Sequence, residues 1–323
     1  MQDAFGRTIS YLRLSVTDRC DFRCWYCLPR SHRDFAKQRD WLQADEIERL
    51  VTIFAQLGVR HVRLTGGEPL TRRDIVDISG RVRRVPGIDE LSLSSNASQL
   101  ARLAAPLAAS GVSRLNISLD TLNPQRFFEL TGGELAPVLA GIEAARDAGF
   151  SLIKINMVML RDVNDDELVP MVEYCRERGL ALRFIETMPI GSGGIEANQH
   201  YISLKVIEER LHHHYRLQPA AIRGSGPARY LQVEDSDLVV GFITPQSQHF
   251  CDKCNRIRLS AIGALHLCLN SENPLSLRDM VRGGADDLAI KAAILKSMAF
   301  KPERHTFDQP ETHTIRPMSA LGG

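Results

Sequence analysis

The chain has 323 residues, of which 44% are hydrophobic and 24% are charged, and its formal net charge is +1. This length allows one barrel-sized domain and a smaller one. The near-zero charge gives no general attraction to nucleic acid or to a membrane surface, and no apolar stretch reaches the length of a transmembrane helix. The first residues lack the apolar core of a secretory signal. We therefore expect a cytoplasmic protein without a nucleic-acid or membrane partner.

Strand and helix patterns alternate along the first two thirds of the chain. The predicted strands cover residues 11–17, 61–65, 90–95, 114–120, 152–160 and 181–188. Amphipathic helical stretches, such as residues 45–57, lie between them. Six such units predict a parallel sheet with right-handed crossovers. A doubly wound sheet and an incomplete β/α barrel both fit this order of elements.

The alternation of side chains within the predicted strands favours the barrel. Leu12 and Leu14 alternate with Arg13 and Ser15, and the other strands repeat this pattern. Parallel strands that are covered on both faces should be apolar throughout, and unpaired buried charge is costly. One face should therefore line a wet cavity or hold a charged ligand, as in the lumen of a partial barrel. An open sheet with one solvated face is the alternative.

Three cysteines follow the first predicted strand in a C-x3-C-x2-C spacing: Cys20, Cys24 and Cys27. Zinc sites favour C-x2-C pairs and four protein ligands, so this spacing fits them poorly. A [4Fe–4S] cube normally takes four cysteines, so three of them leave one iron open. The spacing resembles the signature of the radical S-adenosylmethionine (SAM) enzymes, in which SAM chelates that iron. A zinc site that lacks one ligand, or three unrelated cysteines, is the alternative.

A second triad lies far along the chain, formed by Cys251, Cys254 and Cys268. Cysteines in a cytoplasmic protein indicate metal binding or catalysis rather than disulfides. The two triads together predict two [4Fe–4S] clusters, each with one open iron. We expect a radical SAM partial barrel in residues 1–220 and an auxiliary-cluster domain, ending in a diglycine tail, in residues 221–323.

The segment Thr65-Gly66-Gly67-Glu68-Pro69 follows the second predicted strand. Loops after the strands of a β/α barrel gather at one rim, so this segment should lie beside the first triad. Its glycines permit close backbone approach, and Glu68 offers a carboxylate to an ammonium group. The radical SAM family uses such a segment to hold the amino group of SAM.

Longer runs of sequence resemble one family, the GTP 3′,8-cyclases. The resemblance is carried by residues 12–20, 63–69, 116–120, 184–186 and 251–260 and by the last two glycines. It implies an incomplete (β/α)6 TIM-like barrel with a smaller C-terminal domain that carries a second Fe–S cluster. It also implies a lyase that converts GTP to (8S)-3′,8-cyclo-7,8-dihydroguanosine 5′-triphosphate, the first step of molybdenum cofactor (molybdopterin) biosynthesis.

The resemblance implies roles for individual residues. The first triad would hold the cluster that binds SAM, and the second triad would hold a cluster that binds the guanine. The residues implied to contact SAM are Tyr26, Gly67, Ser118 and Met188. The residues implied to contact GTP are Arg13, Arg63, Ser94, Lys154, Arg256, Ile257 and Arg258. The tail residues implied to enter the catalytic pocket are Gly322 and Gly323.

The implied partners follow from the same family. They are GTP, a flavodoxin- or ferredoxin-like electron donor, a second copy of the chain in a homodimer, and cyclic pyranopterin monophosphate synthase as the next enzyme. One departure concerns the turn after the third predicted strand, where Ala97 replaces the usual glycine. This change matters if the turn requires a positive φ.

Two other classes of function stay open at this point. One is a different radical SAM enzyme, whose C-terminal cluster serves the modification of a peptide. It would leave the segment from Arg256 to Arg258 unexplained. The other is a non-catalytic metal or nucleic-acid module, and the near-zero net charge speaks against it.

Overall fold

The structure is a computed structural model that describes residues 1–221, 226–270, 274–307, 309 and 316–322. Its strands are β1 (Tyr11–Ser15), β2 (His61–Thr65), β3 (Glu90–Ser95), β4 (Arg114–Ser118), β5 (Leu152–Val158), β6 (Ala181–Ile185), β7 (Leu217–Ala220), β8 (Arg229–Val233), β9 (Val239–Ile243), β10 (Arg256–Leu259), β11 (Ala264–His266) and β12 (Leu275–Ser276). Its α-helices are α1 (Ala44–Gln56), α2 (Ile75–Arg84), α3 (Leu100–Ala109), α4 (Pro124–Thr131), α5 (Leu135–Asp147), α6 (Leu168–Glu177), α7 (Gly191–Ala197), α8 (Leu204–His212), α9 (Leu277–Arg282), α10 (Asp287–Met298) and α11 (Met318–Leu321).

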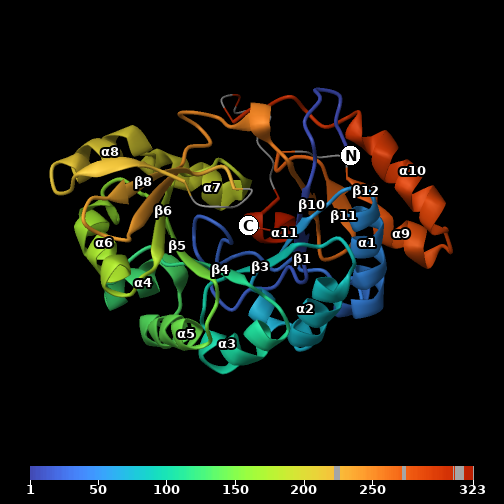
Figure 1. Ribbon diagram of the computed structural model, residues 1–323, viewed down its shortest axis with the longest axis horizontal. Coiled ribbons are helices and arrows are strands. Elements are labelled where there is room, and N and C mark those ends of the chain that lie inside the picture. Colours follow the sequence, from blue (N-terminus) through green and yellow to red (C-terminus); the bar gives the residue numbers. More distant parts are fainter. Residues whose placement is uncertain (222–225, 271–273, 308, 310–315, 323) are drawn as a thin grey trace.

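The six predicted strands form the centre of one curved sheet. Strands β1 to β6 are neighbours in chain order, and each pairs with the next in parallel. A doubly wound sheet would reverse its strand order at a switch point, and this sheet has none. Helices α1 to α6 lie along its outer side (Figure 1). Within the described residues, no hydrogen bonds join the sheet's edge strands β12 and β7. The expected incomplete barrel is therefore confirmed.

The predicted strands begin where the observed strands begin, but four of the six end two or three residues earlier than predicted. At these points the chain leaves the sheet to build the loops of the rim. The N–H of Leu160, for example, donates to the Asn164 side chain at 2.9 Å rather than to a neighbouring strand. The predicted helix 45–57 corresponds to α1, whose first turn is closed by a capping box between Gln43 and Glu46.

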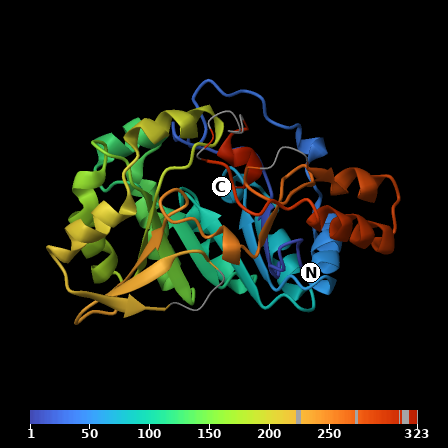
Figure 2. The same ribbon diagram turned by 90° about the horizontal axis from the view of Figure 1, so that it is seen from above.

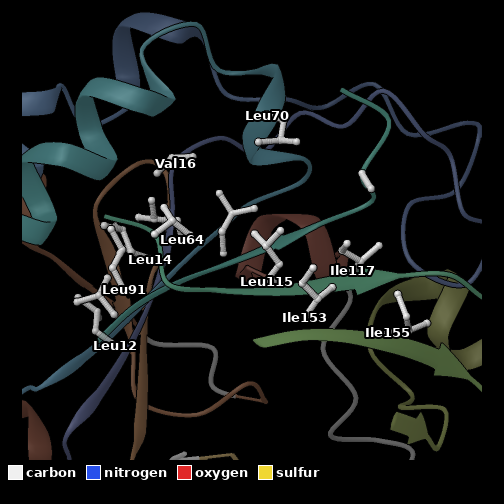
Figure 3. Packing of buried hydrophobic residues seen from close by; sticks show 14 of the residues in the cluster. Leu12, Leu14, Val16, Leu64, Leu70, Leu91, Leu115, Ile117, Ile153 and Ile155 are labelled. Atoms are coloured by element: carbon white, nitrogen blue, oxygen red, sulfur yellow. The ribbon is translucent and has the colours of Figure 1, made fainter. Parts of the chain in front are cut away.

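The apolar face of the strands packs against the helices. Leu12, Leu14, Leu64, Leu91 and Leu115 have no exposed surface. Figure 3 shows the side chains of this cluster along neighbouring strands, between the sheet and the helices. Burial of each such leucine contributes about 1.5–3 kcal/mol to folding. Because side chains alternate along a strand, this packing forces the polar residues between them toward the inner face.

The C-terminal third extends the sheet at both edges, which the sequence did not predict. Strand β9 pairs in parallel with β6, and β10 pairs in parallel with β1. Strands β8 and β7 continue one edge, and β11 and β12 continue the other. The chain then returns to the middle of the molecule, where α11 lies inside the curve of the sheet in both views (Figures 1 and 2). No helix in the described parts of the chain combines the length and the apolar character needed to cross a lipid bilayer.

Candidate active site

The loop after β1 carries the first cysteine triad at the rim of the barrel. Hydrogen bonds to the end of α4 hold it, because Arg23 N–H donates to the carbonyl of Thr131 at 2.7 Å. The turn then closes on Cys24, whose carbonyl accepts from the N–H of Cys27 at 2.9 Å. The thiols of Cys20 and Cys27 act electrostatically on Cys24, and burial raises the pKa of Cys24. Three thiols thus lie together in a sheltered loop.

This arrangement fits an iron–sulfur cube better than a single metal ion. All seven cysteines are free thiols. Among the described residues, no three histidine, cysteine or carboxylate side chains converge closely enough to hold one ion. A cube needs wider spacing, because each cysteine binds a different iron at its own corner. The residues present therefore suit a [4Fe–4S] cluster with one iron open to a further ligand.

The Gly-Gly-Glu segment packs against the cysteine loop. The N–H of Gly67 donates to the Thr17 carbonyl at 2.9 Å, and a Cβ at Gly67 would lie 2.2 Å from the Arg19 carbonyl oxygen. Only glycine allows this approach. The Glu68 carboxylate is buried and accepts from the N–H of Asn96 at 2.7 Å and from the Ser95 hydroxyl at 2.8 Å. Burial raises its pKa to about 8. Glu68 thus links two rim turns, rather than standing free for an ammonium group.

The turn after β3 keeps the backbone conformation for which glycine is usual. Ala97 has a φ of 64°, and its N–H donates to the Ser95 hydroxyl at 2.9 Å. A left-handed residue with a Cβ costs about 1–2 kcal/mol. The replacement therefore strains this turn, because Ala97 adopts a positive φ that glycine reaches without cost.

The residues expected to contact SAM lie at the same rim. Tyr26 donates its hydroxyl to the carboxylate of Asp120, which also accepts from the N–H of Val158 at 2.8 Å. Burial raises the pKa of Asp120 to about 6. Ser118 is exposed at the end of β4, and Met188 follows β6 and packs beside the tail helix α11. Contact of these residues with SAM stays a prediction.

The second triad lies beyond the edge of the barrel that β10 forms. Cys251 and Cys254 share one short turn, closed by a hydrogen bond of 3.0 Å from the N–H of Cys254 to the carbonyl of Cys251. The thiols of Cys254 and Cys268 act electrostatically on Cys251, so the three lie together. Although burial acts to raise it, the pKa of Cys254 is lowered by the charges of Arg256 and Lys301. The second triad therefore has a more cationic setting than the first.

Three arginines form a row across neighbouring strands on the inner face. Arg13 of β1 lies beside Arg258 of β10 on one side and Arg63 of β2 on the other. Arg63 also donates to the hydroxyl of Ser92, at 3.4 Å. Burial, followed by the charges of Arg258 and Arg63, holds the pKa of Arg13 well below its usual range. Burial likewise lowers the pKa of Arg258 to about 10.

A second set of polar groups continues the inner face along the next three strands. Ser94, Asn116 and Lys154 are register partners on β3, β4 and β5. The ammonium of Lys154 donates to the Tyr230 hydroxyl at 3.1 Å, and burial, with the charge of Arg183, lowers its pKa to about 7.

The lumen is therefore rich in positive charge. No ion pair joins Arg13, Arg63, Lys154, Arg183 or Arg258 to a carboxylate in the described ranges of the chain. Buried cations of this kind are costly unless an anion joins them. A polyphosphate would supply that anion and accept hydrogen bonds from several guanidinium groups.

Two residues of this lumen were missed by the sequence prediction. The guanidinium of Arg183 donates to Asn156 Oδ1 at 2.8 Å and to Asn116 Oδ1 at 2.5 Å. Its position on the inner face of β6 follows the same alternation, so the strand pattern could have identified it. Tyr230 reaches the lumen from β8, which no local pattern indicated.

The remaining predicted residues differ in how they face the lumen. Ile257 is buried in the hydrophobic core, on the side of β10 opposite to Arg256 and Arg258, so only its backbone can face a ligand. Gly322 lies in the lumen, where its carbonyl accepts from Arg258 at 2.6 Å and from Arg13 at 3.1 Å. Gly323 lies outside the described residues.

Comparison with known proteins decides the family. The Radical SAM superfamily profile matches residues 14–175, and the Molybdenum Cofactor Synthesis C profile matches residues 180–307. The GTP 3′,8-cyclase of Paracoccus denitrificans (strain Pd 1222) is 46% identical over 99% of this chain and 95% of its own. That of Pseudomonas entomophila (strain L48) is 45% identical over 99% of this chain and 97% of its own. This chain belongs to the GTP 3′,8-cyclase family.

Solved structures share the fold of this family member at low sequence identity. SuiB of Streptococcus suis, solved bound to precursor peptide SuiA, is 15% identical with a TM-score of 0.63, over 94% of this chain and 76% of that one. SuiB bound to S-adenosylmethionine is 15% identical with a TM-score of 0.60, over 97% of this chain and 78% of that one. Likeness at this level shows the fold alone.

Membership in the GTP 3′,8-cyclase family confirms several expectations from the sequence. They are the radical SAM fold, the class of enzyme, and the Fe–S and SAM cofactors. The two alternatives, a peptide-modifying enzyme and a non-catalytic module, do not fit identity of this level along the whole length of two cyclases.

Proposed function

We propose that this protein converts GTP to (8S)-3′,8-cyclo-7,8-dihydroguanosine 5′-triphosphate in the first step of molybdenum cofactor biosynthesis. The observation that carries the proposal is the row of Arg258, Arg13 and Arg63, which shares the inner face of the sheet with Lys154. The loop that carries the first cysteine triad lies at the rim of the same barrel. These cations lack carboxylate partners within the described chain, and a nucleotide triphosphate would supply the missing charge.

The first triad would hold the cluster that binds SAM, and the second triad would hold the cluster that faces the nucleotide base. When bound, the first cluster and SAM supply the radical chemistry that removes a hydrogen from the ribose of GTP. The contribution of the chain is placement. Tyr26, Gly67, Ser118 and Met188 would hold SAM at the rim, while the cations hold GTP in the lumen.

The residues of the lumen would divide the work of holding GTP. Arginine forks suit the phosphate oxygens, because each guanidinium donates several parallel hydrogen bonds. Ser94, a hydroxyl beside Asn116 on the neighbouring strand, would contact the sugar end of the nucleotide. Arg256, two residues before Arg258, would bring charge from beside the second triad to the same ligand. The side chain of Ile257 would support this strand from the core.

The tail would close the lumen over the bound nucleotide. Gly322 already binds Arg13 and Arg258, and Leu321 packs with Ile190 and Phe307 in a small apolar cluster. This cluster would exclude water from the reacting atoms, which prevents side reactions of a radical. Gly323 would be the last residue of the tail that closes the lumen.

We also propose the division into residues 1–220 and residues 221–323. Support comes from the cysteines, because the first triad lies wholly in the first part and the second triad wholly in the second. The continuous sheet ties the two parts together at both edges of the barrel. The lumen would accordingly be built by both.

The proposed partners follow from the reaction. A flavodoxin- or ferredoxin-like donor would reduce the first cluster, and cyclic pyranopterin monophosphate synthase would consume the product. Seven free thiols suit the reducing cytoplasm. Leu288, Leu295 and Phe300 are exposed apolar side chains on and after α10, and a second copy of the chain would cover them in a homodimer.

The experiment that tests the function is anaerobic turnover of the reconstituted protein with GTP, SAM and dithionite. Liquid chromatography with mass spectrometry should find 5′-deoxyadenosine and a cyclised nucleotide in equal amounts. Cleavage of SAM without consumption of GTP would contradict the proposal and indicate another radical SAM substrate. ATP in place of GTP is the control, and it should give little product.

A further inference from the structure

A short segment after α10, residues 301–303, begins with the buried Lys301 and connects parts of the chain that carry the second triad. The ammonium of Lys301 donates to the carbonyl of Arg256 at 3.0 Å and also to the carbonyl of Leu267. Arg256 lies two residues after Cys254, and Leu267 immediately precedes Cys268. The Lys301 side chain therefore holds the segment next to Cys254 and the segment next to Cys268 at a fixed separation.

Arg7 connects the third ligand segment to the same place. Its guanidinium donates to the carbonyl of Cys251 at 2.9 Å, to that of Glu303 at 2.6 Å and to that of Pro302 at 2.7 Å. Arg7 and Asp3 are both buried and form an ion pair of 2.6 Å. The charge of Arg7 is therefore already neutralised within the protein.

Lys301 differs from Arg7 because no carboxylate among the described residues neutralises its charge. Its residue surface is 3% exposed, and both of its hydrogen bonds go to neutral main-chain carbonyls. In the described part of the chain no carboxylate forms an ion pair with it. The groups whose negative charge acts most strongly on Lys301 are Cys254 and Cys268, two of the proposed cluster ligands. A buried ammonium without an anion is costly, so a cluster held by these cysteines is the natural source of compensation.

We propose that Lys301 is the charge partner of the second iron–sulfur cluster, positioning its ligand segments and raising its reduction potential. The proposal rests on the assignment of a cluster to the second triad. Each electron added to a cluster makes it more negative, so a fixed ammonium nearby stabilises the reduced form more than the oxidised form. Lys301 acts through the ligands and the field at the cluster, and is thus a positioning residue.

The test compares three substitutions in full-length protein that carries only the second cluster, obtained by replacing Cys20, Cys24 and Cys27 with alanine. Lys301→Met removes the charge and keeps the volume, Lys301→Gln removes the charge and keeps a donor, and Lys301→Arg keeps the charge. A dithionite titration followed by electron paramagnetic resonance measures the potential. Both neutral variants should shift the reduction equilibrium at least tenfold toward the oxidised form, which is 59 mV for one electron. The arginine variant should stay near wild type.

The matched control is the double substitution Asp3→Asn with Arg7→Gln. It removes one positive and one negative charge, so the net charge at the site is unchanged. This double variant should lose iron to a chelator faster than the wild type, because the cluster is held less firmly. Its reduction potential should be unchanged. A similar shift in potential in this control would overturn the proposal, because loosening of the site alone would then explain the effect.

Three further outcomes decide the case. A wild-type potential in Lys301→Gln would overturn the proposal, since a hydrogen bond without charge would then be enough. If the neutral variants lose the cluster, the amount of iron retained is measured instead of the reduction potential. Retention of iron in Lys301→Arg alone would support charge pairing. Equal loss of iron in all three variants would overturn the proposal. Absence of iron in the protein with an intact second triad would instead refute the cofactor assignment itself.

Discussion

The guanidinium of Arg258 donates to the carbonyl oxygen of Gly322 at 2.6 Å, across 64 positions of sequence. Arg13, the neighbour of Arg258 across the sheet, donates to the same oxygen at 3.1 Å. The tail is therefore held by two of the cations that we assign to the triphosphate. Tail and nucleotide share these donors, so the placement of one depends on the other.

A methyl group at Gly322 should displace the tail. A Cβ there would lie 2.4 Å from Ser15 Oγ and 2.9 Å from Thr65 Cγ2, and the φ of 76° disfavours any other residue. We expect Gly322→Ala to lower the rate of cyclisation about 100-fold, because misplacement of the reacting atoms by about an ångström has that effect. Iron content and the midpoint of thermal unfolding should change little, since the end of a chain buries little surface.

Gly149→Ala is the matched control for the tail variant. Gly149 has the same φ of 76°, but no atom lies within 4 Å of a Cβ there. It should lower stability through backbone strain while leaving turnover per folded protein unchanged. Deletion of the last two residues should reproduce the loss seen in Gly322→Ala. Wild-type turnover in the deletion would mean that the tail takes no part in catalysis.

Iron content should divide between the two triads. Reconstitution without oxygen should give about eight irons per chain, because each triad supports one cube. Alanine at Cys20, Cys24 and Cys27 should halve the iron and abolish SAM cleavage. Alanine at the three cysteines of the second triad should also halve the iron but leave some cleavage of SAM uncoupled from GTP. Cys175→Ala is the control and should keep all the iron; full iron in either triple variant would refute the two-cluster assignment.

The arginines of the lumen should discriminate GTP from SAM. Arg63→Ala and Arg258→Ala should each weaken GTP binding by about 1.5–3 kcal/mol, the loss of a charged hydrogen bond, and change SAM binding little. Arg258→Lys should rescue only partly if the contact uses two parallel N–H groups. Arg216→Ala, at a side chain that is 89% exposed, is the control for the loss of one positive charge. Equal losses for both ligands, measured by anaerobic calorimetry, would indicate damage to the barrel instead.

Binding of GTP should weaken as the pH rises through about 7. Burial, with the charges of Arg183 and Arg63, lowers the pKa of Lys154 to about 7, so the free protein loses this ammonium above that pH. A bound triphosphate favours the charged form, so binding takes up a proton and becomes weaker at higher pH. Calorimetry between pH 6 and 9, in buffers of different ionisation enthalpy, measures both effects.

Lys154→Met separates this titration from that of the phosphate itself. The variant should bind GTP weakly at every pH, and only the titration of the phosphate should remain in its profile. An unchanged slope in the variant would show that the pH dependence does not come from Lys154.

Much of the barrel and the loops of the site could be predicted because they depend on local spacing. The alternation of Leu12 and Leu14 with Arg13 fixed which face of the first strand is apolar, and the structure confirms it. Cys20, Cys24 and Cys27 lie in one short loop, so chain connectivity alone keeps them close. The sequence by itself therefore determined the order of strands and helices along the chain, the apolar face of the strands and the first triad.

The tertiary structure alone decided which distant segments complete the lumen. Arg256 and Arg258 are two residues apart and so share one face of an extended segment, but the sequence did not show that this segment pairs with β1 beside Arg13. Tyr230 reaches Lys154 and Gly322 reaches Arg258 from other parts of the chain. Such contacts depend on the packing of whole strands and helices. The periodicity of one segment does not indicate which distant segment it will pair with. The sequence therefore determined which residue types act at the site, and the tertiary structure determined which segments surround it.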